Sequence, residues 1–340
     1  MRFLQSTWCP VCLGIITTIL ILTSLLSSQK KVLVHSSSNQ YREGDEWNPP
    51  DEAEIPYDSN GDLIRYGKDL IVNTSKYLGP KGVISSISNG MNCQNCHINA
   101  GRENFANPFS GVKNNYPKYR DRSGRTESYE FRVNECMQRS MNGMPLDSLS
   151  LEMRAMVAYV KWMGKDVPKG IRPIGTGTQM PQLLNRAADP AKGKIVYTNN
   201  CQRCHGENGQ GLLSIDSSSY TYPPLWGENS FNTSAGMYRL SYLAGFIKNN
   251  MPYDEATWKN PKLSNEEAWD VAAYVASQPR PEKRFAYDWP NPSKKPFDFP
   301  FGPYTDHFSE QQHKYGPFEP IQKAKAGSES SSKQITAGSK

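Results

Sequence analysis

Two short motifs of one pattern, CQNCH at residues 93–97 and CQRCH at residues 201–205, constrain the fold of this 340-residue chain more than any other feature. The pattern C-x-x-C-H is typical of covalent attachment of a c-type haem, in which both cysteines bind the haem and the adjacent histidine becomes an iron ligand. A zinc site built from four cysteines is the alternative, but it does not need a histidine directly after each pair. We therefore expect two covalently bound haem c groups. The attachment residues would be Cys93, Cys96, His97, Cys201, Cys204 and His205.

The sequence around the two motifs also repeats. A short amphipathic segment with a central glycine precedes each motif, with Gly67 in the first copy and Gly193 in the second, and such a glycine would let another helix approach closely. After each motif, at residues 150–163 and 264–278, a serine and an early glutamate open a run with apolar residues at helical spacing. This order predicts an all-α fold of two tandem cytochrome c domains, each with one covalent haem, plus an extended C-terminal tail.

The remaining stretches indicate how the chain is organised. An uncharged, mostly apolar stretch at residues 11–26 predicts a signal sequence that is either cleaved or retained as an inner-membrane anchor, and hence a periplasmic location. The predicted parts are a signal sequence or membrane anchor at 1–30, a linker at 31–60, cytochrome c domain 1 at 61–165, a linker at 166–186, cytochrome c domain 2 at 187–280, and a Pro- and aromatic-rich tail at 281–340 that is disordered at its end.

The charge of the chain bears on its partners. The formal net charge is +6, without a long run of lysine and arginine, which argues against nucleic acid as a partner. A mildly positive surface suits a small anion or an acidic redox protein.

The second axial ligand of each iron has few candidates. Only five histidines are present, and His35, His307 and His313 lie outside both repeats, so methionine, cysteine or lysine is the expected ligand type. In domain 2, Met251 precedes a proline between the haem motif and the last helix, where a thioether ligand is expected. Lys248 is the alternative there.

Domain 1 offers two rival sulfur ligands. Alignment of the repeats places Met144 over Met251, which favours Met144 as the ligand. Against this, Cys136 is the one cysteine left after two in the export segment and four in the haem motifs, and an odd cysteine in an oxidising compartment is a candidate reactive thiol. A helix predicted over residues 127–141 places Arg132, Cys136 and Ser140 on one face. Arg139 flanks that face, and Arg122 and Arg125 lie just before the helix.

Three segments together resemble a known family. NCQNCHINAGR, RVNECMQRSMNG and the tail FPFGPYTDHFSEQQHKYGPFEPI are similar to the dihaem thiosulfate dehydrogenase / tetrathionate reductase family, over about residues 60–322. The resemblance implies that His97 and Cys136 ligate an active-site haem in domain 1, and that Arg122, Arg132 and Ser140 shape an anion pocket beside it. It implies Met251 as the ligand of an electron-transfer haem in domain 2. Some family members carry lysine directly before that methionine, whereas this chain has Asn250.

The resemblance also implies an activity. The chain would be an oxidoreductase that interconverts thiosulfate and tetrathionate, with a small redox protein such as a c-type cytochrome as its electron partner. Two alternatives stay open: a dihaem electron-transfer cytochrome without substrate turnover, and a sulfur-conjugating cytochrome that acts on a carrier protein.

Overall fold

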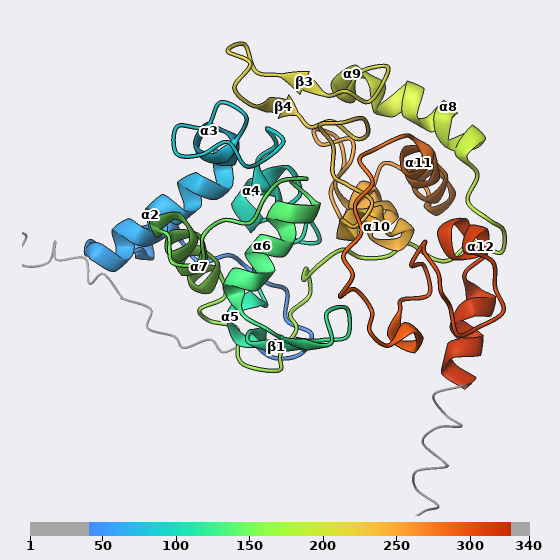
Figure 1. Cartoon of the computed structure of the whole chain (residues 1–340), viewed down its shortest axis with the longest axis horizontal. Coiled ribbons are helices and arrows are strands. Elements are labelled where there is room, and N and C mark those ends of the chain that lie inside the picture. The colour runs from blue at the N-terminus through green and yellow to red at the C-terminus, as the bar shows by residue number, and fades with distance from the viewer. Residues whose placement is uncertain (1–40, 328–340) are drawn as a thin grey trace, which may run out of the picture. The chain divides into compact units, whose positions relative to one another are not determined.

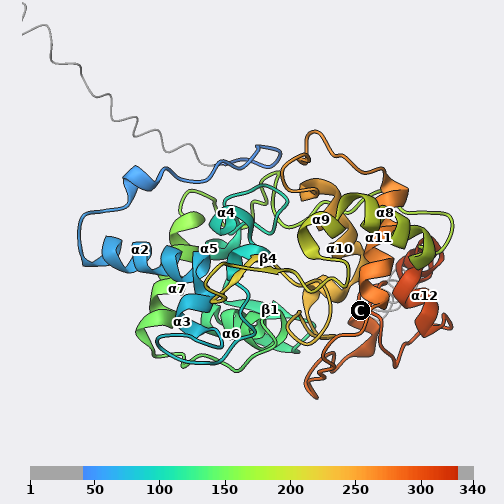
Figure 2. The same ribbon diagram turned by 90° about the horizontal axis from the view of Figure 1, so that it is seen from above.

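The fold is mostly helical and uses one plan twice along the chain. The computed structural model describes residues 41–327, and Figures 1 and 2 show the first repeat in blue to green beside the second in yellow to orange. The first repeat contains α2 (Ser59–Val72), α3 (Thr74–Leu78), α4 (Ile98–Gly101), α5 (Val112–Asn115), α6 (Tyr129–Arg139) and α7 (Leu151–Met163). The second contains α8 (Pro190–Asn200), α9 (Gln202–His205), α10 (Leu240–Asn250) and α11 (Asn265–Ser277). Single turns of 3-10 helix are η1 (Glu52–Glu54), η2 (Cys93–Asn95), η3 (Gly236–Tyr238) and η4 (Pro292–Lys294).

The first and last long helices of each repeat pack against one another at a glycine. A Cβ atom added to Gly67 in α2 would lie 2.0 Å from the carbonyl oxygen of Ala155 in α7. In the second repeat, a Cβ atom on Gly193 in α8 would lie 1.9 Å from the carbonyl oxygen of Asp270 in α11. Both approaches are too close for any side chain, which confirms the predicted reason for the two glycines.

The helix that closes each repeat begins where the sequence indicates. Ser150 caps α7 and Ser264 caps α11, each by accepting a hydrogen bond from a backbone N–H in the first turn. At α11 the Glu267 carboxylate in turn accepts a hydrogen bond from the backbone N–H of Ser264, which completes a capping box. These contacts satisfy N–H groups that the helix itself leaves without partners.

Two short hairpins interrupt the helical plan. β1 (Lys118–Arg120) pairs antiparallel with β2 (Arg125–Glu127), and β3 (Leu212–Leu213) pairs with β4 (Tyr220–Tyr222). The first hairpin takes up the start of the helix predicted over 127–141, so that α6 begins only at Tyr129, after the Ser128 cap.

The two repeats are joined by hydrogen bonds. Asn232 of the second repeat donates through its backbone N–H to the Arg139 carbonyl oxygen at 3.1 Å, and through its side chain to the Gln138 carbonyl oxygen at 2.9 Å. Asn89 of the first repeat donates to the Ser230 carbonyl oxygen at 3.2 Å. The end of α6 is therefore held by both repeats.

The C-terminal segment lies over the domains, but it is not extended throughout. It contains α12 (Glu310–Tyr315), and residues 319–327 are also helical. Figure 1 shows this segment in red beside α10 and α11. Phe318 packs on Trp269 of α11 with ring centroids 5.4 Å apart, so apolar burial holds the helical part of the tail in place.

Several sequence predictions fall on residues 1–40 and 328–340, which lie outside the described part of the chain. They are the signal sequence or anchor, the start of the first linker, the disordered end of the tail, and His35. Within residues 41–327, each helix is too short or too polar to cross a membrane.

Candidate functional site

A cavity of about 420 Å³ in the first repeat brings together the first motif and Cys136. Cys93, Cys96 and His97 line it, and α6 supplies Cys136. The Nδ1–H of His97 donates to the Asn107 carbonyl oxygen at 2.6 Å, which fixes the ring. His97 is also within hydrogen-bonding reach of the Cys136 thiol. The two side chains therefore face one another across the cavity.

The cysteines of this cavity differ in their electrostatics. Burial raises the pKa of Cys93 to about 11 and that of Cys96 to about 12. Burial acts on Cys136 in the same direction, but the positive charge of Arg132 and the hydrogen bond with His97 outweigh it and lower its pKa to about 7. Cys136 is therefore the thiol of this cavity that is closest to a thiolate at neutral pH.

A second cavity, of about 480 Å³, contains the second motif. It is lined by Cys201, Cys204, His205 and Met251. The Nδ1–H of His205 donates to the Pro223 carbonyl oxygen at 2.8 Å, so this ring is held in the same way as the first.

The alternative ligands lie elsewhere in the structure. Lys248 is outside the second cavity, and its amine donates to the Leu263 carbonyl oxygen at 3.1 Å. Met144 does not line the first cavity, and its side chain is 57% exposed. His313 is buried in the tail, where its ring bonds the Phe297 carbonyl oxygen and Asp306.

Both cavities fit a covalently bound haem. Each pairs two cysteines with one histidine whose Nδ1 is fixed by a carbonyl oxygen, and each is also lined by a candidate sulfur ligand, Cys136 in the first and Met251 in the second. The residues that would hold the groups are the four motif cysteines, His97 and His205. Met91, Asn92 and Cys96 line both cavities, so only a thin shared wall separates them.

The predicted anion-binding residues Arg122, Arg132 and Ser140 all line the first cavity, but the two arginines differ in whether a carboxylate is paired with them. Arg132, Cys136 and Ser140 do so from α6, in keeping with their predicted common face. The negative charge of Cys136 raises the pKa of Arg132, whose guanidinium forms no ion pair with a carboxylate in residues 41–327. Arg122, by contrast, is largely buried and ion-paired to Asp288 at 2.9 Å.

Asp288 is a residue that the sequence analysis missed. Its carboxylate accepts hydrogen bonds from both Arg122 and Arg139, and Arg139 is also paired with Glu135 at 2.8 Å. Its neighbour Trp289 lines the cavity as well, and the Trp289 Nε1–H is buried without a hydrogen-bond partner. The only sequence signal would have been a single aspartate within an aromatic tail segment, YDWP, which has no motif spacing to the arginines.

Comparisons with known proteins agree with the two-repeat plan. Residues 85–168 match the family model described as SoxA/TsdA, cytochrome c domain, and residues 190–279 match the model described as Cytochrome c. These matches confirm the predicted fold class and the two covalently bound haems.

Relatives that match about two thirds of the chain have one name in common. The chain is 39% identical to a thiosulfate dehydrogenase of Stutzerimonas stutzeri, over 69% of this chain and 73% of the relative. It is 38% identical to one of Allochromatium vinosum, over 68% of this chain and 83% of the relative. A solved structure, thiosulfate dehydrogenase (TsdBA) from Marichromatium purpuratum, matches this chain with a TM-score of 0.64 and 31% sequence identity. The match covers 71% of this chain and 51% of the chain in that structure. The chain belongs to the thiosulfate dehydrogenase family of dihaem c-type cytochromes.

Proposed function

We propose that this protein oxidises thiosulfate to tetrathionate, and that it also catalyses the reverse reduction. The observation that carries the proposal is the meeting of His97, Cys136 and Arg132 in one cavity walled by the first haem motif. The names of the relatives support the thiosulfate substrate. The residues that would ligate the haem irons are His97 and Cys136 in domain 1, and His205 and Met251 in domain 2.

Cationic side chains of the first cavity would bind thiosulfate. Thiosulfate is a dianion, and two of them must meet for their sulfur atoms to couple. Arg132, next to Cys136, offers a planar set of N–H donors that matches the oxygens of a sulfonate group. Ser140 adds a hydroxyl at the end of the same helix face. These residues would bind the substrate and lower the repulsion between the two anions.

Cys136 has a chemical role available besides ligation. In the mechanism we propose, its sulfur bonds to the outer sulfur of thiosulfate, and this step releases two electrons. A second thiosulfate then attacks this same sulfur, which is now bonded to the Cys136 Sγ; the S–S bond to the cysteine breaks, and the Cys136 thiolate and tetrathionate are released by thiol–disulfide exchange. When bound, the haems supply one-electron acceptors for the electrons released. The shared wall of Met91, Asn92 and Cys96 supports direct transfer between the two cavities.

The setting of the reaction is also a proposal. We propose a periplasmic protein whose electrons pass to a small redox protein, such as a c-type cytochrome. The N-terminal segment would act as an export signal or an anchor in the inner membrane.

The test is a visible spectrum of the purified, oxidised dihaem protein before and after thiosulfate is added without oxygen. Reduction of the haem bands, with one tetrathionate formed for every two electrons taken up, is the expected result. Tetrathionate should reoxidise the reduced protein. An unchanged spectrum, together with no tetrathionate in the presence of an electron acceptor, would overturn the proposal in favour of an electron carrier or a sulfur-conjugating cytochrome.

Mass spectrometry tests the covalent step separately. Protein treated with thiosulfate should carry the mass of one thiosulfate on the peptide that contains Cys136. Turnover without any such adduct would favour oxidation of thiosulfate without a bond to the cysteine.

A further inference from the structure

The first cavity carries more positive charge than the predicted arginines alone. Six cationic side chains line it, against the single carboxylate of Glu135. The cationic residues are Lys118, Arg120, Arg122, Arg132, Arg139 and Arg239.

Carboxylates already neutralise three of these side chains. Arg122 and Arg139 share Asp288, with ion-pair distances of 2.9 and 2.8 Å. Arg239 pairs with the buried Asp298 at 2.5 Å. Since these guanidinium groups have partners, they attract a further anion less strongly than their number suggests.

Lys118 and Arg120 remain uncompensated. Within residues 41–327, neither side chain forms an ion pair or a hydrogen bond. Both lie on β1 two positions apart, so they share one face of the strand, and both line the cavity. Between them, Tyr119 is 60% exposed, as expected for a side chain on the opposite face.

Electrostatic interactions link this strand to Cys136. Tyr116 lines the cavity and lies within electrostatic reach of both Arg132 and Arg120. Arg132 in turn interacts with Cys136 one helical turn away on α6. The cavity thus has an inner cation beside Cys136 and an outer pair of cations on the hairpin.

We propose that Lys118 and Arg120 form an outer anion-binding position, which holds the second thiosulfate while the first lies against Arg132 and Cys136. The inference rests on the proposed function and adds the place of the second substrate. Two separate cationic positions also match tetrathionate, which carries a sulfonate group at each end. An anionic propionate of the first haem would have the same charge preference, so the test must separate the two occupants.

The experiment uses the oxidised dihaem protein and sulfate as an unreactive dianion. Sulfate binding is measured by calorimetry for the parent protein, the double variant Lys118→Gln/Arg120→Gln and both single variants. We expect the double variant to bind sulfate about ten-fold more weakly, as for the loss of a charge-assisted hydrogen bond. Because no turnover is needed, the result stands even if the proposed reaction fails.

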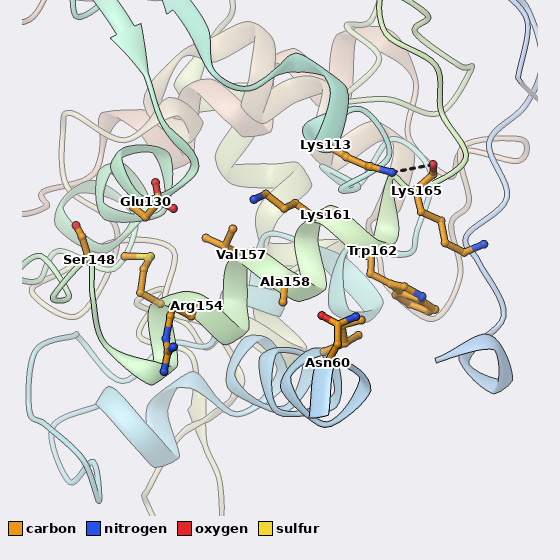
Figure 3. Close-up of a pocket in the computed structure, with 12 residues that line it drawn as sticks. Asn60, Lys113, Glu130, Ser148, Arg154, Val157, Ala158, Lys161, Trp162 and Lys165 are labelled. Atoms are coloured by element: carbon orange, nitrogen blue, oxygen red, sulfur yellow. Dashed lines mark hydrogen bonds between the residues drawn. The ribbon is translucent and has the colours of Figure 1, made fainter. Parts of the chain in front are cut away.

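A matched control removes two charges from the same domain. Lys113 and Lys161 line a separate groove of about 470 Å³ around α7, shown in Figure 3, and neither lines the first cavity. The variant Lys113→Gln/Lys161→Gln should bind sulfate like the parent. In turnover assays the half-saturating thiosulfate concentration should rise about ten-fold only in the Lys118/Arg120 variants, and more so at low salt.

Two outcomes would overturn the proposal. Equal sulfate affinity in the parent and the double variant would mean that the hairpin cations do not bind the anion. A changed spectrum or reduction potential of the first haem, with unchanged sulfate affinity, would assign the two side chains to a propionate instead. Single variants that retain the parent spectrum guard against misfolding of the double variant.

Discussion

The carboxylate of Asp288 accepts two hydrogen bonds from Arg122, at 3.1 Å from Nε and 2.9 Å from Nη2, although 166 positions separate the two residues. The same carboxylate accepts two more from Arg139, at 2.8 Å each. One tail residue therefore orients both Arg122 and Arg139 in the cavity wall and offsets part of their positive charge.

Replacement of Asp288 by asparagine should destabilise the protein by about 3 kcal/mol, because it leaves the mostly buried Arg122 without its carboxylate partner and Arg139 with Glu135 alone. Denaturant unfolding of the dihaem protein, followed by circular dichroism, measures the change. The control is Asp254→Asn, whose ion pair with Arg203 lies on the surface and whose loss should leave stability unchanged. Equal effects of the two substitutions would contradict a structural role for Asp288.

Substitution at Cys136 and at Met144 should have opposite results. Cys136→Ala should abolish thiosulfate oxidation and alter the ferric spectrum of one haem, because it removes the thiol that interacts with His97. Met144→Ala should change neither property, since that side chain is exposed outside the cavity. Visible and near-infrared spectra of both variants decide between the two sulfurs. A loss of ligation in Met144→Ala would reverse the assignment.

Arg132→Lys tests whether the shape of the cation matters as well as its charge. A lysine keeps the charge but cannot present two parallel N–H groups to a sulfonate, so kcat/KM for thiosulfate should fall by roughly ten-fold or more. Arg132→Gln should lower it further. Steady-state kinetics of both variants provide the comparison, and parent-like activity of Arg132→Lys would show that a point charge is sufficient.

In the second cavity, Met251→Ala should change the spectrum and the reduction potential of one haem, because Met251 lines the cavity that also contains His205 and is the proposed second ligand there. Lys248→Ala should leave both unchanged, since the Lys248 amine is bound to the Leu263 carbonyl oxygen. Potentiometric titration followed by visible spectra compares the variants. A shift in the lysine variant alone would point to lysine ligation.

Gly67→Ala and Gly193→Ala should each destabilise the fold by about 2 kcal/mol, because the new methyl group would overlap a carbonyl oxygen of the facing helix. Gly327→Ala provides the control, since nothing lies within 4 Å of a Cβ atom built there and Gly327 lines neither of the two cavities. Thermal unfolding of the three variants tests the helix contacts. A tolerated alanine at Gly67 or Gly193 would mean that the paired helices can move apart.

Much of the architecture could be predicted from sequence because its signals are local. The haem motifs place cysteine and histidine within five residues, helix periodicity and the Ser150 and Ser264 caps mark the closing helices, and the two central glycines indicate close helix contacts. The common face of Arg132, Cys136 and Ser140 also follows from helical spacing alone. The identities of the iron ligands remain predictions.

Only the tertiary structure decided which charges in the cavity have partners. The sequence places Arg122 and Arg139 near Cys136, but their neutralisation by Asp288 depends on how the tail packs back onto the first domain. Within residues 41–327, Arg120 has no carboxylate partner, whereas the Lys248 amine is bound to a carbonyl oxygen, and both results depend on which segments pack nearby. Spacing along the chain determines which residues share a helix face or a motif, whereas an ion pair depends on which distant segment fills the neighbouring space.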